Sequence, residues 1–350
     1  MAIVWIGPLP PPVHGASLIT QRYLDLVRRH ADDVEVVPIE GTTGRGRARF
    51  HLSRVAAHLR AVRAVLAGGG DATVYLSLGG GPSLWYQLPV VLAARARGAR
   101  LVLHHHSYKY IAAHAAAMSL VCRSGPGARH LFLSAAMADA FTARYPVADR
   151  RVVSNAHFVE PAEREGPEPE GIALIHVSNL SVPKGSLTAL RTHAALREAG
   201  VEATLTLIGP VADPQVRAYL DDPACSADPS VRHLGAQPTA TIYRELDRAG
   251  LFLFPTSYEN EAEPLVVLEA LSRGVPVLAA RRGALPEVLP GDWLVDDPAP
   301  GIWAEAVLAH HREPWAERSG RARRAFGARR AGADVVELVT DAASAGDRVS

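Results

Sequence analysis

Lysine, cysteine and long apolar runs are scarce in this 350-residue sequence. Lys109 and Lys184 are the only lysines, so 35 of the 37 basic residues are arginine. Where arginine is used so widely, a retained lysine indicates a need for a compact ammonium rather than a planar guanidinium. Cys122 and Cys225 are the only cysteines, and their positions provide neither zinc-ligand spacing nor a disulfide framework. These absences favour a reducing, cytoplasmic environment.

No apolar run reaches the ~18 residues that a membrane-spanning helix needs. The first residues lack the charged region and cleavage site of a secretory signal. The net charge of +1 is far from the strongly basic balance of nucleic-acid-binding domains, so we expect no nucleic-acid partner. With 48% hydrophobic and 21% charged residues, the chain can form two buried cores.

Short apolar segments alternate with helical patterns in both halves of the chain, which is typical of parallel α/β sheets. The expected strands are 3–6, 34–38, 73–76, 101–103, 130–133, 151–153, 173–177, 203–208, 231–234, 251–254, 275–279 and 293–295. The expected helices are 17–30, 52–67, 84–96, 135–144, 185–199, 214–220, 240–249, 264–272 and 303–310. Between the halves, the proline- and glutamate-rich segment 155–171 is typical of a linker.

This pattern predicts an N-terminal Rossmann-like domain at 1–158 and a C-terminal Rossmann-like domain at 159–325. We expect a last helix at 326–350, which is long enough to cross back to the first domain. Ligands of such sheets bind at the carboxyl ends of the strands. We therefore expect a site in a cleft where the two sheets face each other.

Segment 41–70 is unusually basic, with six arginines, two histidines and no acidic residue. A solvated helix face and loop would explain this composition. The alternative is contact with an anionic acceptor or with a membrane surface. Composition alone leaves both interpretations open.

A glutamate-rich loop and a helix follow the expected strand at 251–254. Glu261 lies in the loop, Pro264 suits the first helical position, and Glu269 lies inside the helix. The free N–H groups of a helix N-terminus suit a diphosphate. Glu261 can accept hydrogen bonds from sugar hydroxyls, and Glu269 can reach a ribose diol. Solvated surface glutamates are the alternative, but the apolar neighbours of Glu269 indicate a buried helix whose carboxylate needs partners.

This segment resembles the Glu-x7-Glu motif of the retaining, family-4 type of GT-B-fold glycosyltransferases, the glycosyl transferases of group 1. The following residues 274–279, Gly-Val-Pro-Val-Leu-Ala, are similar to the usual continuation of that motif. The resemblance implies that Glu261 contacts the donor sugar and Glu269 the nucleotide ribose, with Leu265 and Val266 beside the diphosphate. Residues 262–264 depart from the frequent Gly-Phe-Gly, which would bring the Glu263 carboxylate near the phosphates.

Segment 176–185 passes from an expected strand through a loop to Lys184 and Gly185 at the start of a helix. An ammonium there can neutralise a departing diphosphate, whereas the alternative is a surface lysine in a turn. The segment resembles the strand–loop–Lys-Gly element of the same family. The resemblance implies diphosphate binding by Lys184, with Asn179 at the position where arginine is usual.

Two elements of the first domain also resemble this family. The proline-rich segment 7–17 is similar to the family's loop ending in Gly-Gly, whose backbone approaches the donor phosphate; Gly15 matches and Ala16 replaces the second glycine. Three consecutive histidines, His104 to His106, follow the strand at 101–103. No carboxylate or cysteine pairs with them at metal-ligand spacing, so we expect no metal site. The resemblance implies that His106 faces the donor sugar, and we expect the other two to be structural.

Taken together, the resemblance implies an α/β protein of GT-B architecture that is a metal-independent hexosyltransferase. It would move a sugar from a nucleotide-sugar co-substrate, UDP- or GDP-linked, to a glycan, lipid-linked or small-molecule acceptor, without a cofactor. Front-face displacement with retention would use His106, Lys184 and Glu261. The acceptor would belong to the first domain, where Lys109, Arg45 and Arg47 are the candidates. A cytoplasmic location, with the inner face of the membrane as an option, agrees with this interpretation.

Two alternatives remain at this point. One is a nucleotide-sugar epimerase on the same fold, which needs no acceptor. The other is a non-catalytic nucleotide-sugar-binding subunit, for which the missing arginine at Asn179 is the argument.

Overall fold

The computed structural model describes residues 2–39, 47–164, 167–332 and 334–340. The chain forms two compact units: unit 1 comprises residues 1–158 with 332–350, and unit 2 comprises residues 159–331. Each unit contains a six-stranded sheet in which all neighbouring strands are parallel. The predicted α/β fold class is confirmed.

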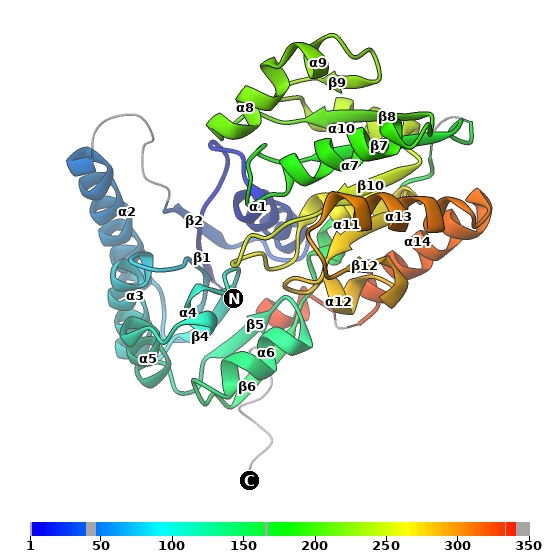
Figure 1. The fold of residues 1–350 in the computed structure, drawn as a ribbon. Helices are drawn as coiled ribbons and strands as arrows, with labels where there is room; N and C mark the ends of the chain where they lie inside the picture. The colour runs from blue at the N-terminus through cyan, green and yellow to red at the C-terminus, as the bar shows by residue number, and fades with distance from the viewer. Residues whose placement is uncertain (1, 40–46, 165–166, 333, 341–350) are drawn as a thin grey trace. The chain divides into compact units, whose positions relative to one another are not determined.

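Unit 1 has the strand order β2-β1-β3-β4-β5-β6 (Figure 1). Its strands are β1 (Ile3–Gly7), β2 (Val34–Pro38), β3 (Thr73–Leu78), β4 (Arg100–His105), β5 (Arg129–Phe132) and β6 (Asp149–Val152). Its helices are α1 (Gly15–Arg28), α2 (Arg47–Ala67), α3 (Ser83–Arg97), α4 (Lys109–Ala112), α5 (Ala116–Ser124), α6 (Ala135–Thr142), η1 (Asn155–Phe158) and α15 (Glu337–Thr340). The central strands are buried almost throughout because helices cover both faces of a parallel sheet.

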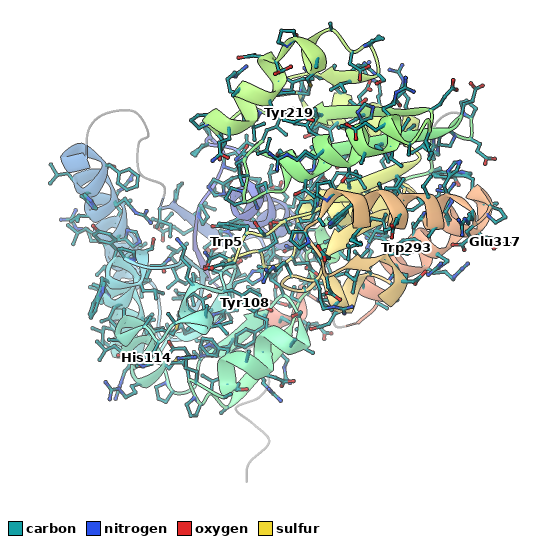
Figure 2. The ribbon with its side chains drawn as sticks, viewed as in Figure 1. Trp5, Tyr108, His114, Tyr219, Trp293 and Glu317 are labelled. Carbon is teal, nitrogen blue, oxygen red and sulfur yellow. The ribbon has the colours of Figure 1, made fainter. Side chains whose placement is uncertain are left out.

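An aromatic cluster forms the centre of unit 1. Trp5 stacks on Tyr75 with ring centroids 3.6 Å apart, and Tyr23 meets both rings edge-on. Trp5, labelled in Figure 2, is fully buried. The Tyr75 hydroxyl lies 2.7 Å from His104 Nδ1, and the Tyr23 hydroxyl donates to the carbonyl of Val335. This last bond ties the segment after residue 331 to α1.

Unit 2 has the strand order β12-β11-β10-β7-β8-β9. Its strands are β7 (Ile172–Val177), β8 (Ala203–Ile208), β9 (Val231–His233), β10 (Leu251–Phe254), β11 (Val277–Ala280) and β12 (Leu294–Val295). Its helices are α7 (Ser186–Glu198), α8 (Pro214–Asp221), α9 (Pro223–Ser226), α10 (Thr239–Arg248), α11 (Leu265–Ser272), α12 (Leu285–Val288), η2 (Gly291–Trp293), α13 (Pro300–His311) and α14 (Trp315–Arg330). The chain reverses direction across the sheet between the neighbouring strands β7 and β10, where ligands of such sheets bind.

The described residues place the last long helix at other bounds than 326–350. Helix α14 begins after Pro314 and ends before Gly332, within unit 2, and the described residues from 334 on belong to unit 1. The backbone is already extended at the C-cap Ala331, with φ −66° and ψ 140°, and Gly332 follows with a φ of +144°, which favours glycine. Beyond it, the described part of the chain holds only the short helix α15 in unit 1. None of the described helices is long and apolar enough to cross a bilayer.

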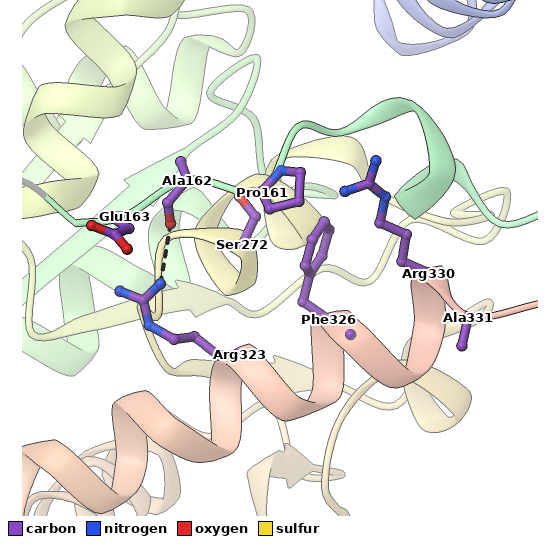
Figure 3. A pocket seen from close by; sticks show the side chains of 9 residues that line it. Pro161, Ala162, Glu163, Ser272, Arg323, Phe326, Arg330 and Ala331 are labelled. Carbon is purple, nitrogen blue, oxygen red and sulfur yellow. Dashed lines mark hydrogen bonds between the residues drawn. The ribbon is translucent and has the colours of Figure 1, made fainter.

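A cavity of about 450 Å³ lies in unit 2 between segment 161–163, the end of α11 and α14 (Figure 3). Phe326 and Pro161 provide apolar walls. Arg323 donates a hydrogen bond of 3.1 Å to the carbonyl of Ala162 and one of 3.5 Å to the carbonyl of Arg273. Arg323 therefore fastens the first residues of unit 2 to α14. None of the predicted site residues lines this cavity.

Helix α13 places a histidine in the core of unit 2. His310 is buried against Trp293, with ring centroids 5.1 Å apart, and neither ring nitrogen has a hydrogen-bond partner among the described residues. Burial, together with the positive charges of Arg318 and Arg321, lowers the pKa of His310 to about 3. The ring is therefore neutral in the folded protein at pH 7.

We predict that His310→Phe stabilises the protein, most strongly in mild acid. Below the ordinary histidine pKa of about 6.5, His310 becomes protonated in the unfolded chain but stays neutral in the folded protein until about pH 3. The free energy of unfolding of the wild type therefore falls as the pH is lowered through this range. Removing the imidazole should add roughly 1 kcal/mol at pH 7, from loss of the unpaired polar atoms, and about 2 kcal/mol more at pH 5. Denaturant unfolding at both pH values measures the difference. Equal pH dependence in the two proteins would contradict this account.

Candidate active site

Two neighbouring strands of unit 2 bring the predicted lysine and glutamate together. Lys184 follows β7 and Glu261 follows β10, and these strands pair in parallel, so their carboxyl ends lie at the same edge of the sheet. Lys184 Nζ lies 2.7 Å from Glu261 Oε2. The same oxygen accepts a bond of 3.2 Å from the Thr256 hydroxyl, and the Tyr258 ring centroid is 4.5 Å from Nζ. Glu261 is only 8% exposed, so the ammonium compensates a carboxylate that would otherwise be costly to bury.

Two glycines allow the loops of this site to approach each other. Gly185 caps α7 with a φ of +80°, and a Cβ on it would lie 2.1 Å from the carbonyl oxygen of Pro255. Gly283 has a φ of +51°, and a Cβ there would lie 2.2 Å from the carbonyl oxygen of Glu261. Any larger residue would push these loops apart.

Helix α11 begins at Leu265, because Pro264 is its N-cap rather than its first helical residue. The first intrahelical bond is donated by Val267 to Pro264, so the N–H groups of Leu265 and Val266 precede the helical ladder. Glu269 is buried further along α11, where its Oε1 accepts a bond of 3.0 Å from Tyr243. Glu261 and Glu269 thus lie in the loop before the helix and within it, as the sequence predicts.

Glu263 has a partner that the sequence analysis did not predict. Its side chain is completely buried and pairs with Arg329 of α14, with Arg329 Nε 2.7 Å from Glu263 Oε1. Arg329 also contacts Glu287, at 3.3 Å. The charge of Glu263 is therefore compensated within unit 2, where the pair anchors the loop before α11 to the last helix.

Sequence analysis missed the role of His176 in β7. Its Nδ1 donates to the carbonyl of Leu253, at 2.9 Å, so Nε2 is left to accept from the hydroxyls of Ser178 and Ser186, at 2.9 and 3.1 Å. Burial lowers the pKa of His176 to about 4, which keeps it neutral. The ring thereby connects β10 to both ends of the loop that carries Lys184. A histidine inside an otherwise apolar strand was the available signal. The neighbouring Asn179 is exposed.

In unit 1, the predicted glycine turn forms the beginning of α1. Gly15 and Ala16 are the first two helical residues, and a Cβ on Gly15 would meet no atom within 4 Å. His14 caps the helix: its Nδ1 accepts from the N–H of Ser17, at 3.2 Å, while the Ser17 hydroxyl accepts from the N–H of His14. The backbone at Gly15 is therefore open to an approaching ligand.

The three consecutive histidines occupy different environments. His104 and His105 are the buried end of β4, where His105 Nδ1 lies 3.0 Å from the Tyr110 hydroxyl and Nε2 lies 2.9 Å from His130 Nδ1. His106 follows the strand and is partly exposed, but its Nε2 is buried without a partner among the described residues. Burial, with a smaller effect of His14, lowers the pKa of His106 to about 4. Its neutral ring could donate or accept a hydrogen bond.

A pocket of about 190 Å³ opens at the carboxyl ends of β1 and β3, where the chain reverses direction across the sheet of unit 1. It is lined by Pro8, His14, Ala16, Ile39, Phe50, Arg54, Ser77, Leu78, Gly79 and Gln87. The Arg54 guanidinium lies 5.4 Å from the ring centroid of Phe50 and 5.8 Å from that of Tyr86. One of its nitrogens donates to Ser83, at 3.0 Å, whereas Nε is buried without a partner in the described chain.

The acceptor-side candidates of the sequence analysis are less well defined. Arg45 lies outside the described residues, and only the backbone of Arg47, at the start of α2, is described. Lys109 is exposed at the start of α4. Sequence reasoning did not select Arg54, which lines the pocket. Within the described ranges, no group of three or more potential ligands is arranged to hold a metal ion.

Comparison with known proteins shows what the segment that carries these loops is similar to. Residues 171–312 match the model of the glycosyl transferases group 1 family. The sulfoquinovosyl transferase SQD2 of Arabidopsis thaliana is 33% identical over 127 residues, which are 36% of this chain and 22% of that protein. The D-inositol 3-phosphate glycosyltransferase of Corynebacterium glutamicum is 30% identical over 140 residues, or 37% of this chain and 33% of that one. The matches thus span a third or less of these relatives.

Solved structures agree over the entire fold. HepE of Anabaena in complex with UDP has a TM-score of 0.69 at 16% identity, and covers 98% of both chains. Sucrose-phosphate synthase of Thermosynechococcus elongatus has a TM-score of 0.72 at 14% identity, again over 98% of both. Residues 171–312, with Lys184, Glu261 and Glu269 among them, carry the match to the glycosyl transferases group 1 family, and the chain as a whole has the GT-B fold.

Proposed function

We propose that this chain is a retaining hexosyltransferase that moves a sugar from a nucleotide-diphosphate sugar to an acceptor hydroxyl. The observation that carries the proposal is the Lys184–Glu261 pair, held at 2.7 Å next to the free N-terminus of α11. A cation and a helix N-terminus suit a diphosphate. A fixed carboxylate beside them suits a sugar hydroxyl.

In this proposal Lys184 binds the carboxylate and the diphosphate at once. An ammonium has three N–H donors, of which one points to Glu261. The remaining donors, with the N–H groups of Leu265 and Val266, would stabilise the charge that develops on the departing diphosphate. Gly15 and Ala16 of α1 would add backbone donors from unit 1, with Asn179 near the same group.

Glu261 and Glu269 would hold the two ends of the donor. Both hydrogen bonds to Glu261 end on Oε2, which leaves Oε1 to accept from a sugar hydroxyl. Glu269, further along α11, would accept from the ribose. The acceptor hydroxyl would attack from the face that the diphosphate leaves, with a phosphate oxygen taking its proton. His106, whose ring is neutral, would donate a hydrogen bond to the donor sugar.

The comparisons favour a particular donor class without defining an acceptor. HepE has been solved in complex with UDP-glucose, with 15% identity to this chain, so we propose a UDP-sugar, with a GDP-sugar as the alternative. We place the acceptor in unit 1, at the pocket that Arg54 lines. Arg45, Arg47 and Lys109 stay candidates on the same side. A cytoplasmic location is part of this proposal.

Replacing Glu269, Glu261 and Lys184, the three charged residues of the proposed donor site, should produce three different defects. Glu269→Ala should weaken both the nucleoside diphosphate and the intact donor by roughly 1–3 kcal/mol, because charge-assisted hydrogen bonds to the ribose are lost. Glu261→Ala should leave nucleoside diphosphate affinity nearly unchanged but lower kcat, because sugar placement matters most in the transition state. Lys184→Ala should lower both, and Lys184→Arg should not restore them. Calorimetric titration with UDP and GDP, combined with donor turnover, measures these effects.

The reverse pattern, in which Glu261→Ala loses nucleotide affinity and Glu269→Ala keeps it, would contradict the proposed donor orientation. Incubation with the donor alone provides the functional control. Release of an epimerised or free sugar at the transfer rate would favour an epimerase, and failure to bind any nucleoside diphosphate would remove the proposal altogether.

The ion pair between Glu263 and Arg329, which holds the loop before α11, gives a further prediction. Arg329→Met should leave the buried Glu263 carboxylate without its closest cation, at a cost of about 3–5 kcal/mol in unfolding free energy. Because Glu263 holds the loop that carries Glu261, kcat should fall as well. The double variant Glu263→Leu/Arg329→Met should recover most of the stability, since no charge then stays buried. Arg330→Met, one residue further along α14, is the matched control, and an equal loss there would refute the argument.

Arg54 gives a test of the acceptor side. Arg54→Gln should raise the acceptor KM at least tenfold and change donor affinity much less, because the guanidinium lines this pocket of unit 1, where Ala16 is the one proposed donor residue among the lining residues and would act through its backbone. Initial rates at varied acceptor and donor concentrations separate the two constants. Arg28→Gln, at the exposed end of α1, serves as the control. An unaltered acceptor KM would remove Arg54 from the acceptor site.

A further inference from the structure

Helix α2 exposes an apolar line to solvent. Leu52, Val55, Leu59 and Leu66 are 68%, 41%, 54% and 46% exposed. Their spacings of three, four and seven residues place them on one side of a helix with 3.6 residues per turn. The opposite side of α2 supplies the buried residues that pack on unit 1, among them Ala57, Ala61 and Val65. Core packing therefore does not explain the outward line.

Helix α3, beside α2 in Figure 1, repeats this pattern. Trp85 and Leu92 are 55% and 48% exposed, and the exposed residues Pro89 and Ala96 lie at the same helical spacing. The two helices are joined where the Arg54 guanidinium donates to Ser83. Of the eleven large hydrophobic side chains exposed in the described chain, six lie on α2 and α3. Clustered exposure of this kind marks a surface that meets a partner.

The charge around these helices is strongly one-sided. Residues 41–138 contain eleven arginines, Lys109 and a single acidic residue, Asp71, which gives a net charge of +11, although the entire chain has only +1. The remaining segments together therefore carry −10. Arg60 and Arg63 are exposed on α2 beside the apolar line, and Arg95 and Arg97 are exposed at the end of α3. A basic flank along an apolar line suits an anionic lipid surface.

We propose that the outward face of α2 and α3, the α2–α3 face, docks on a bilayer that contains anionic lipids. The apolar line would enter the boundary between headgroups and acyl chains, Trp85 would lie at headgroup level, and the arginines would meet lipid phosphates. A second copy of the chain is a poorer occupant, because a symmetric contact would bring two segments of +11 together. None of the described helices can span a bilayer, so the contact is peripheral.

This inference goes beyond sugar transfer and does not depend on it. Bilayer binding needs neither the donor nor the Lys184–Glu261 pair. If both proposals hold, the acceptor pocket that Arg54 lines and the face that binds the bilayer belong to the same unit. This favours an acceptor with a lipid anchor.

Vesicle flotation of the full chain tests the proposal without donor or acceptor. Vesicles of phosphatidylcholine with 30% phosphatidylglycerol are compared with pure phosphatidylcholine, at low and at high salt. We expect binding to the anionic vesicles that is at least tenfold stronger than to the neutral ones and that weakens with salt. Two variants divide the face: Leu52→Ser/Leu59→Ser/Leu66→Ser removes the apolar line, and Arg60→Glu/Arg63→Glu reverses its flank. Each should lose at least tenfold in anionic vesicle binding.

All five substituted positions are solvent-exposed, so each variant should keep the wild-type melting temperature. Ile302→Ser, a 42% exposed apolar position on α13 of unit 2, is the control and should bind as wild type does. Equal flotation with neutral and anionic vesicles, or full binding by both face variants, overturns the proposal. So does a concentration-dependent dimer, measured by sedimentation, that the leucine variant abolishes, since a second copy would then be the occupant. Loss of transfer with vesicle binding intact would refute only the proposed function.

Discussion

Burying a carboxylate is costly unless a nearby group compensates its charge, and Lys184 provides that compensation for Glu261. The pair joins the loop after β7 to the loop after β10, two strands that are neighbours in space although 73 residues separate their ends, Val177 and Leu251. A parallel sheet makes such a junction available, because the carboxyl ends of its strands share one edge. The order of the strands therefore decides which side chains meet.

Several features of unit 2 serve this junction. Gly185 and Gly283 let the backbones approach, and His176 holds both ends of the lysine loop. Arg329 fastens the loop before α11 from behind. Each support comes from a different element, so the geometry of the ammonium and the carboxylate is set by several independent contacts. A site that must bind a highly charged ligand benefits from such a frame, because little reorganisation is then needed when the ligand arrives.

Periodicity and local spacing predicted the strands and most of the long helices, since these depend on residues that are neighbours in sequence; the long helix α14 (Trp315–Arg330) is the exception. The short helices α4 and α5 were not predicted; α5 lies in an alanine-rich stretch and has no side-chain cap at its beginning. The partner of Glu263 could not be predicted either, because Arg329 is 66 residues away in sequence and lies on a helix whose bounds the sequence did not define. Arg54 was hidden among six similar arginines, because only the fold selects which of them lines a pocket.

The scarcity of lysine makes the chain an unusually simple target for amine chemistry. Its two lysine side chains are distributed one to each unit, Lys109 on α4 and Lys184 before α7. A bifunctional acylating reagent therefore has a single lysine–lysine pair to join, and that pair spans both units. The length of the shortest reagent that cross-links Lys109 to Lys184 would set an upper limit on the distance between their two amines in solution. If Lys184 binds the diphosphate as we propose, a bound ligand would shield one of the two lysines, so the same reaction would also report ligand binding.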